Sequence, residues 1–294
     1  MDVAIVGTGM IGASVGLAAR RAGMHVVGWD VDGDALAGAR GLGALDEAAA
    51  SLADACAAAE TIVIAAPLRA TLTLLGALPP TTAGLVIDVA SVKAPVIAAA
   101  CAIPAFVATH PLAGSERAGP ASARADLFDG RVWAYVPPAD PRLEERVRAL
   151  VALLGGRPLP IGAERHDALV GFTSHLPQVA STALGALLAR RLEEPALLDL
   201  CGTGMASMTR LAGSAWTVWD GILDANAAAV AQEVRAFAGI LRSVADAVEA
   251  RDSRTLREHF AEGAAAAAAL AANEPRAGSV IPDTPNERPS RGIL

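Results

Sequence analysis

A glycine-rich turn between a predicted strand and a predicted helix constrains the fold more than any other feature of the chain. Residues 2–7 form a short apolar run, the letters GTGMIG occupy residues 7–12, and residues 13–22 are small and helix-prone. A strand that is apolar on both faces is typical of a parallel sheet covered by helices. A second apolar run at 25–29 ends in Asp30. Gly-x-Gly-x-x-Gly in this context, with an acidic residue after the next strand, predicts a dinucleotide-binding unit.

Each glycine of the turn has its own expected role. Gly7 allows the tight turn, Gly9 lets the backbone approach a pyrophosphate, and Gly12 lets the helix pack closely against the strand. The helix amino terminus offers free N–H groups and a partial positive charge to the phosphates. Asp30 is expected to accept hydrogen bonds from ribose hydroxyls and to repel a 2′-phosphate, which favours NAD over NADP. A glycine-rich turn without a ligand is the alternative. The residues predicted to bind NAD are Gly7, Gly9, Met10, Ile11, Gly12 and Asp30.

Strands and helices go on alternating up to about residue 162. Apolar runs predict five further strands, at 61–65, 85–89, 105–108, 132–136 and 157–161, and two further helices, at 68–78 and 141–154. Repeated β-α units of this kind predict a Rossmann-type, doubly wound parallel sheet. After residue 163 only helices are predicted, at 163–191, 195–211, 215–251 and 255–272. The predicted organisation is an α/β dinucleotide-binding domain at 1–162, an all-helical substrate and dimerisation domain at 163–272, and a loosely ordered tail at 273–294.

Composition excludes several classes of protein. Hydrophobic residues make up 53% of the chain, which indicates a globular protein. The net charge is −7 and no basic stripe is visible, which argues against nucleic acid as a partner. The three cysteines are widely spaced and form no metal-binding pattern, so we expect reduced thiols and no metal site. The window 168–189 holds too many polar groups to span a membrane cheaply. We expect a cytoplasmic protein without a signal peptide, acting on a small molecule.

The segment 215–251 carries a long apolar stripe, with residues such as Trp219, Leu223, Val230 and Leu241 mostly three or four positions apart. Such a stripe needs a partner. The partner is either another helix of this chain or a second copy of it, and the length of the segment favours a homodimer through the helical domain.

Four polar clusters remain as candidates for chemistry: residues 91–93, 109–119, 174–178 and 209–210. His110 follows a predicted strand, and a histidine suits proton transfer near neutral pH, although a purely structural histidine is the alternative. Ser91 stands where a hydroxyl either caps a helix or faces a ligand. Arg210 lies in an apolar stretch and needs an anionic partner, either Asp199 or Glu193 or a substrate carboxylate.

These clusters, taken in order, resemble the prephenate/arogenate dehydrogenase family of tyrosine biosynthesis. The resemblance rests on GTGMIG at 7–12, DVASVK at 88–93, HPLAGSERAG at 110–119, SHLPQ at 174–178 and MTRLA at 208–212, and Trp219 continues it. The pairing of His-Pro-x-Ala-Gly-Ser-Glu with Ser-His-Leu-Pro is specific to this family among Rossmann enzymes.

The resemblance implies an oxidative decarboxylation, in which a cyclohexadienol ring gives a hydride to NAD and loses its carboxylate as carbon dioxide. It implies that His110 takes the proton of the ring hydroxyl, that Ser91 holds the same hydroxyl, and that Arg210 binds a substrate carboxylate. The resemblance also implies further residues at the substrate, which are Ser174, His175, Gln178, Glu116 and Lys93. Among them, Glu116 is implied to gate or orient the pocket.

Two departures from the family pattern leave the substrate open. Gln178 stands where many prephenate-specific members carry a second histidine, and Ser207 stands where an acidic residue is common. Prephenate, arogenate and 4-amino-4-deoxyprephenate all remain candidates. Two other readings are a hydroxyacid or imine oxidoreductase that shares only the Rossmann half, and a non-catalytic NAD-sensing protein. The first leaves the motifs of His110 and His175 unexplained, and intact Ser91, His110 and Arg210 argue against the second.

Overall fold

The computed structural model describes residues 2–79, 84–114 and 119–273. They divide into two compact units, one up to Ala245 and one from Asp246 onward. The predicted tail at 273–294, apart from Asn273, and the candidate residue Glu116 lie outside the described residues. The expected division between residues 162 and 163 stays a prediction.

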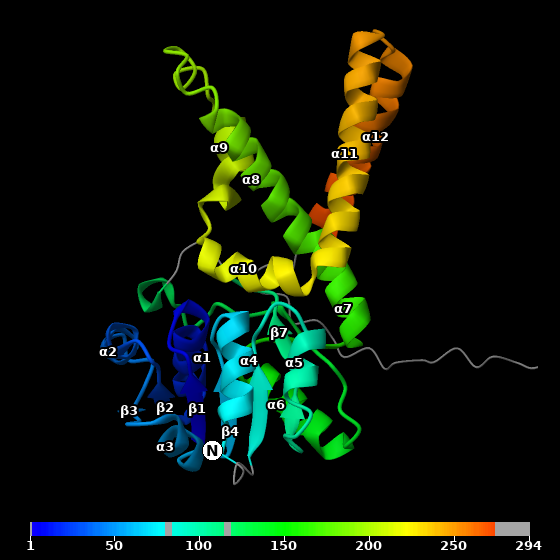
Figure 1. Cartoon of the computed structure of the whole chain (residues 1–294). Helices are drawn as coiled ribbons and strands as arrows, with labels where there is room; N and C mark the ends of the chain where they lie inside the picture. The colour runs from blue at the N-terminus through cyan, green and yellow to red at the C-terminus, as the bar shows by residue number, and fades with distance from the viewer. Residues whose placement is uncertain (1, 80–83, 115–118, 274–294) are drawn as a thin grey trace, which may run out of the picture. The chain divides into compact units, whose positions relative to one another are not determined.

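A six-stranded parallel sheet in the order β3-β2-β1-β4-β5-β6 forms the centre of the first unit (Figure 1). Its strands are β1 (Asp2–Val6), β2 (His25–Trp29), β3 (Glu47–Ala48), β4 (Thr61–Ile64), β5 (Leu85–Asp88) and β6 (Phe106–Val107). The strand order reverses between β1 and β4, so the ligand edge of such a sheet lies at their carboxyl ends. This arrangement confirms the Rossmann-type fold. β3 is absent from the prediction because two residues leave no apolar pattern to read.

A second sheet holds the three remaining strands in the order β7-β8-β9. These are β7 (Thr109–Pro111), β8 (Val132–Tyr135) and β9 (Arg157–Pro160), with β7 antiparallel to β8 and β8 parallel to β9. The expectation that 132–136 and 157–161 extend the parallel sheet is therefore wrong. An apolar run predicts a strand but not its partner, and here β8 pairs with β7, which the sequence presents as a loop.

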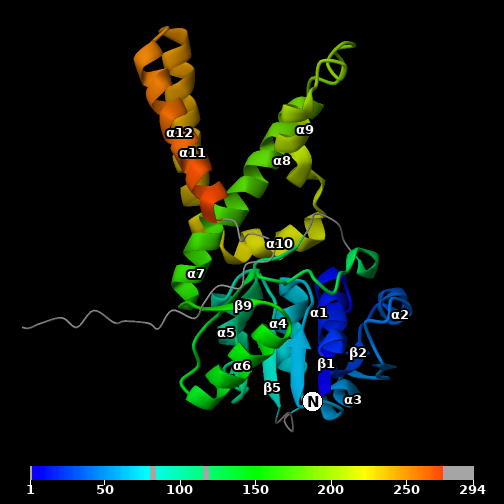
Figure 2. The ribbon, with the colours of Figure 1, turned by 180° about the vertical axis from the view of Figure 1, so that it is seen from behind.

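Helices cover both faces of the parallel sheet. Val3, Ile5 and Val63 point to the face covered by α1 (Met10–Arg21) and α6 (Pro141–Leu153). Their neighbours along the strands point to the opposite face, under α3 (Leu52–Ala57), α4 (Leu68–Ala77) and α5 (Ala94–Ala99). Figures 1 and 2 show the two faces, with α4 in front in the first view and α6 in the second. Two further elements, α2 (Gly33–Gly41) and the short η1 (Pro120–Ser122), complete this part of the chain.

After β9 the described residues form helices only. The first unit continues with α7 (Ala163–Val170), the π-helical turn η2 (Gly171–His175), α8 (Leu176–Ala189), α9 (Thr203–Thr209), η3 (Arg210–Gly213), α10 (Trp216–Ala225) and most of α11 (Ala227–Glu249). The second unit holds the end of α11 and α12 (Ser253–Asn273). No helix in the described parts of the chain is long and apolar enough to cross a bilayer.

Two helical predictions need correction. The helix expected at 195–211 starts only at Thr203, because Gly202 caps it in an extended conformation and turns precede it. The helix expected at 215–251 is two helices that meet at Asn226, where the backbone leaves the helical region (φ −112°, ψ 25°). The apolar stripe continues through the break, which is why the pattern alone does not reveal it.

The helix α10 is packed directly on α4 of the sheet domain. Arg69 on α4 forms ion pairs with Asp220 (2.9 Å) and Asp224 (3.4 Å), and Ile222 belongs to the core cluster beneath α4. A Cβ at Gly221 would lie 3.1 Å from the Arg69 side chain, so the two helices are in close contact there. The sheet and α10 therefore share one core.

Candidate active site

Three segments far apart in the sequence bring their polar residues together at the carboxyl ends of β5 and β6. β5 ends at Asp88 and runs into the connection that holds Ser91 and Lys93, whereas β6 is followed directly by β7. His110 is the middle residue of β7 and pairs with Ala134. The third segment is α7 with η2. This edge of a parallel sheet is where α/β folds bind their ligands.

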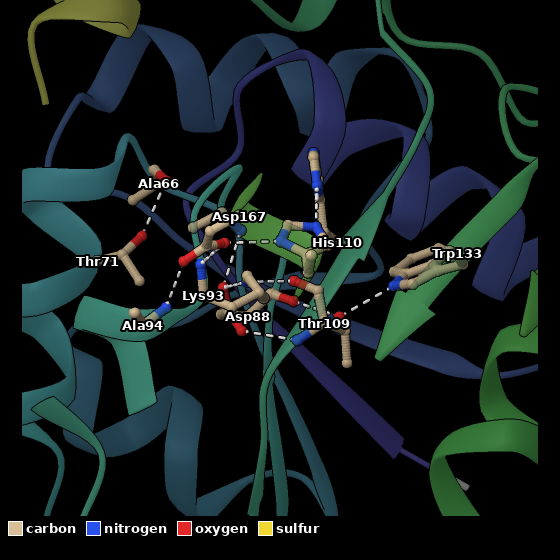
Figure 3. Close-up of polar contacts among 11 residues, drawn as sticks. Ala66, Thr71, Asp88, Lys93, Ala94, Thr109, His110, Trp133 and Asp167 are labelled. Atoms are coloured by element: carbon tan, nitrogen blue, oxygen red, sulfur yellow. Dashed lines mark hydrogen bonds and ion pairs between the residues drawn. The ribbon is translucent and has the colours of Figure 1, made fainter. Parts of the chain in front are cut away.

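A buried ion pair fixes the backbone beside His110. Lys93 and Asp88 are 1% and 0% exposed, and the Lys93 ammonium donates to the Asp88 carboxylate and to the Thr109 carbonyl (Figure 3). Asp88 also accepts the N–H of Thr109 at 2.9 Å, and Trp133 Nε1 donates to the Thr109 hydroxyl at 2.9 Å. Burial lowers the pKa of Lys93, and Asp88 opposes this effect. Lys93, Asp88 and Trp133 thus all bind Thr109. His110 is the next residue in the chain, so its backbone is fixed as well.

His110 is half-buried, and its side chain contacts the buried histidine His166. His110 Nδ1 lies 3.0 Å from His166 Nε2, and the two rings meet edge to face at 73°. His166 is 2% exposed, and its Nδ1 lies 2.7 Å from Asp167 Oδ1. Asp167 also accepts the backbone N–H groups of Lys93 (2.8 Å) and Ala94 (2.9 Å). The result is a continuous chain from the amino end of α5 through Asp167 and His166 to His110.

The pKa values of this chain follow from its burial. Burial lowers the pKa of His110 well below 6.5, and the positive charge of Lys93 and the neighbouring His166 and His175 lower it further. Burial alone would raise the pKa of Asp167, but the hydrogen bonds from His166, Ala94 and Lys93 lower it overall. Asp167 is thus ionised near neutral pH, and His110 is neutral.

His175 is buried next to this chain with one ring nitrogen unused. Its Nδ1 lies 3.2 Å from Asn226 Nδ2, which also donates to the Asp167 carbonyl at 2.8 Å. Trp219 packs edge to face on the ring at a centroid distance of 5.8 Å. Burial lowers the pKa of His175 to about 4. Because Asn226 donates to Nδ1, the neutral ring carries its proton on Nε2, which has no hydrogen-bond partner among the described residues.

Gln178 is fully engaged within the helical region. Its Nε2 donates to the Leu211 carbonyl at 2.8 Å, and its Oε1 accepts from the Ser214 hydroxyl at 3.3 Å. The N–H of Ala212 donates to Ser181 one turn further along α8. The contacts of Leu211 with Gln178 and of Ala212 with Ser181 tie η3, which begins at Arg210, to α8.

The remaining predicted residues lie in different surroundings. Ser91 is half-buried, and α5 starts only at Ala94 with Lys93 as its capping residue, so the helix-cap reading of Ser91 is wrong. Ser174 and Arg210 are exposed and do not enter the buried cluster, and Arg210 stands at the start of η3. The structure thus brings together His110, Lys93 and His175.

The glycine-rich turn leaves space for a ligand at one position only. A Cβ at Gly7 would lie 2.6 Å from the Ala65 carbonyl oxygen, and Gly7 has a φ of +96°. A Cβ at Gly12 would lie 1.9 Å from the Gly7 carbonyl oxygen. Gly9 faces open space, with nothing within 4 Å of the position of a Cβ. Helix α1 starts at Met10 without a side-chain cap hydrogen bond from Gly9 and without an acidic residue in its first turn.

Asp30 is already a hydrogen-bond acceptor within the turn. Its carboxylate accepts the N–H and the hydroxyl of Thr8 at 2.6 and 3.0 Å, and the N–H of Asp32 at 2.9 Å. Met10 and Ile11 are half-buried at the start of α1. The end of the Met10 side chain would lie 3.8 Å from a Cβ at Gly114, which follows β7 in the chain.

Sequence reasoning missed His166, Asp167, Asn226 and the role of Asp88. The first two form the only His-Asp dipeptide of the chain, in a segment predicted as helix. Adjacent histidine and aspartate in a buried helix are a signal that could have been followed, since each needs a partner. Asn226 has no such signal, because only the fold brings it to His175.

Comparison with known proteins gives a consistent relationship. Residues 15–158 match the family model of the prephenate dehydrogenase nucleotide-binding domain, and residues 162–262 match that of the prephenate dehydrogenase dimerization domain. The chain is 36% identical to the probable prephenate dehydrogenase NovF of Streptomyces niveus, over 82% of this chain and 67% of that protein. It is 30% identical to the cyclohexadienyl dehydrogenase of Zymomonas mobilis, over 91% of this chain and 95% of that protein.

Among solved structures, the prephenate dehydrogenase of A. aeolicus, in complex with hydroxyphenyl propionate and NAD+, superimposes with a TM-score of 0.82. The alignment covers 92% of this chain and 98% of that one at 24% identity, which shows a common fold. Both halves of the chain match one family, and two relatives match over most of its length. The chain therefore belongs to the prephenate dehydrogenase family and is a dehydrogenase.

Proposed function

We propose that this protein catalyses the NAD-dependent oxidative decarboxylation of prephenate or arogenate, with His110 as the general base. The observation that carries the proposal is a half-buried, neutral histidine at the carboxyl end of the sheet, with one ring nitrogen bound by His166. A neutral imidazole is the form that accepts a proton, and burial keeps it in that form at neutral pH.

The glycine-rich turn suits NAD. The open space at Gly9 and the uncapped start of α1 provide room and N–H donors for a pyrophosphate. Asp30 disfavours a 2′-phosphate through its charge. When bound, NAD supplies the nicotinamide that accepts the hydride from the substrate ring. The chain itself supplies the position of the substrate and the base.

The other site residues bind and orient the substrate in this proposal. Arg210 binds a substrate carboxylate through its guanidinium, and Ser91 holds the ring hydroxyl that His110 deprotonates. The Nε2–H of His175 offers a donor to an oxygen of the substrate. Ser174 lines the pocket, and Glu116, which lies outside the described residues, has by the family pattern the role of gating or orienting it. Lys93 and Gln178 act indirectly, because their polar atoms are bound within the chain. Lys93 holds Thr109 in position, and Gln178 holds η3 in position.

The test is to follow NADH formation with prephenate, arogenate and 4-amino-4-deoxyprephenate in parallel, each with NAD and with NADP. We expect one of the first two to be oxidised with NAD. Oxidation of the amino compound alone would replace the proposed substrate, and no turnover of any of the three would refute the proposed function.

His110→Asn tests the base separately. We expect kcat to fall roughly 10²–10⁴-fold, the usual contribution of a general base, with NAD affinity unchanged. Arg210→Ala should act instead mainly on the KM for substrate. Activity of the His110 variant at the wild-type level would remove His110 as the base.

We also infer that the protein is a homodimer through its helical region, because that region matches a dimerization domain. Large apolar side chains are exposed there, among them Trp216 (66%), Ile240 (52%) and Leu241 (54%). Exposed apolar side chains in a region that matches a dimerization domain suit an interface between two copies of the chain.

A further inference from the structure

The ring protonation of His110 and His166 can be derived from their hydrogen-bond partners. An ionised carboxylate only accepts hydrogen bonds, so His166 Nδ1, which lies 2.7 Å from Asp167, carries a proton. The other nitrogen of neutral His166 is then an acceptor. His110 Nδ1, which lies 3.0 Å from it, must be the donor. This leaves the lone pair of His110 on Nε2, the nitrogen that His166 does not engage.

We propose that His166 and Asp167 form a proton relay with His110, in which His166 is the residue that holds the proton taken from the substrate. This proposal rests on the proposed function and extends it. The substrate O–H proton moves to His110 Nε2, and the Nδ1 proton of His110 moves to His166 Nε2. The O–H bonding pair becomes the second carbon–oxygen bond as the carbinol carbon is oxidised by the NAD of the proposed function. His110 ends neutral, and His166 ends as an imidazolium next to Asp167.

The charges around the two rings favour this end point. Lys93 donates to the carbonyl of Thr109, the residue directly before His110, so an ammonium lies on the His110 side. His166 has the Asp167 carboxylate as its direct partner. A positive charge shared by the two rings is therefore more stable on His166, next to the Asp167 carboxylate, than on His110, next to the Lys93 ammonium. The groups that face the pair are Asp88 at the end of β5, Lys93 from the connection that follows β5, Asp167 from α7, and His175 from η2.

The relay has a defined end, because Asp167 is a poor base. Its carboxylate accepts two backbone N–H groups as well as the His166 ring, and a carboxylate with that many donors has a low pKa. The proton therefore stays on His166. His166 and Asp167 act through His110 and are positioning residues, not groups that touch the substrate.

The first test reads the ring protons directly in the ligand-free protein. The chain has five histidines, so ¹⁵N-labelled histidine gives few ring signals, each assignable with a single His→Gln variant. We expect His110 and His166 to carry their protons on Nδ1 at neutral pH and His175 on Nε2. A proton on His110 Nε2 or on His166 Nε2 would overturn the proposal whatever the enzyme turns out to oxidise.

The second test separates the relay from simple orientation. In His166→Gln the side-chain oxygen still accepts the Nδ1–H of His110 but cannot take its proton. We expect kcat to fall roughly 10- to 100-fold, with the KM for substrate and the affinity for NAD within about twofold. His25→Gln, on the exposed start of β2, is the matched control. A folded His166→Gln enzyme with the wild-type kcat would show that orientation alone suffices.

Asp167→Asn keeps the size of the side chain and removes its charge. This variant tests the relay even if His166→Gln does not fold. Without the carboxylate charge the imidazolium of His166 loses its direct partner, so kcat should fall roughly 10- to 100-fold, with the KM for substrate and the affinity for NAD within about twofold. Asp129→Asn, at an exposed ion pair with Arg21, is the control. A folded Asp167→Asn enzyme with the wild-type kcat would contradict the relay, whereas an inactive wild-type enzyme would refute only the proposed function.

Discussion

Individual histidines in this protein are kept neutral by burial rather than by a lack of acidic neighbours. His175 is 1% exposed with a pKa lowered to about 4, although the charge of Asp167 acts in the opposite direction. The pKa of His110 is also lowered, and burial is again the largest cause. A histidine whose folded pKa lies below its unfolded pKa binds fewer protons in the folded state. Stability is then fully present above the unfolded pKa and is lost as the pH falls toward the folded one.

His175→Gln should therefore flatten the acid side of the stability curve. Between pH 7 and pH 5 the wild-type protein should lose about 2 kcal/mol of its free energy of unfolding through His175, from a pKa near 6.5 unfolded and about 4 folded. The variant should lack this part of the slope, although it is less stable at pH 7. Urea unfolding at a series of pH values measures both. Equal slopes in the two proteins would show that His175 is not buried neutral. His259→Gln, on α12, is the control.

Lys93 shows where a single residue misleads sequence reasoning. It is the only lysine of the chain and lies in a motif shared with the family, and the resemblance predicts that it contacts the substrate. In the structure its ammonium is bound by Asp88 and Thr109 and is 1% exposed. A buried cation needs its partner, and removing that partner from such a pair typically costs about 3–5 kcal/mol. Its side-chain contacts hold β7 in place.

At the level of elements, the turn before α1 separates two kinds of glycine. Gly9 has a φ of −64°, which any residue adopts, and no atom lies near the position of a Cβ. Gly12 has no such room, because its Cβ would collide with the Gly7 carbonyl oxygen. Gly9 is thus free of any packing requirement, which suits a position reserved for a ligand, and Gly12 is required by the fold.

Alanine at these two positions should have opposite effects. Gly9→Ala should leave the free energy of unfolding within about 1 kcal/mol of wild type and weaken NAD binding roughly tenfold or more. Gly12→Ala should destabilise the fold by about 1–3 kcal/mol, the usual cost of overpacking, or more because the contact is with backbone. Thermal unfolding and NAD titration by calorimetry measure the two effects. Undiminished NAD affinity in Gly9→Ala would place the cofactor elsewhere.

The break between α10 and α11 is an element that depends on distant partners. Asn226 donates to the Asp167 carbonyl and to His175, and these contacts hold the amino end of α11 against α7. The local sequence there is rich in alanine and favours a continuous helix. Tertiary hydrogen bonds override that propensity, so the break is invisible to a reading of periodicity.

At the scale of the whole molecule, the helical region exposes apolar surface that the inferred second copy would cover. Replacing Ile240 and Leu241 with Glu on α11 should turn a dimer into a monomer, since a charge at a buried interface is costly and each lost apolar contact removes roughly 2 kcal/mol. Light scattering coupled to size exclusion measures the mass directly. Val31→Glu, 86% exposed in the sheet domain, is the control. A monomeric wild-type protein would contradict the inferred dimer.

The sequence by itself determines the Rossmann-type order of strands and helices, the glycine-rich turn and the position of His110, because these depend on local periodicity and on residues close together in the chain. The tertiary structure alone decides that β8 and β9 join β7 in a second sheet, that Lys93 is bound by Asp88, and that α7 delivers His166 and Asp167 to His110. These features depend on which distant segments meet. A hydrogen bond between residues 56 positions apart leaves no trace in the spacing of apolar residues along either segment.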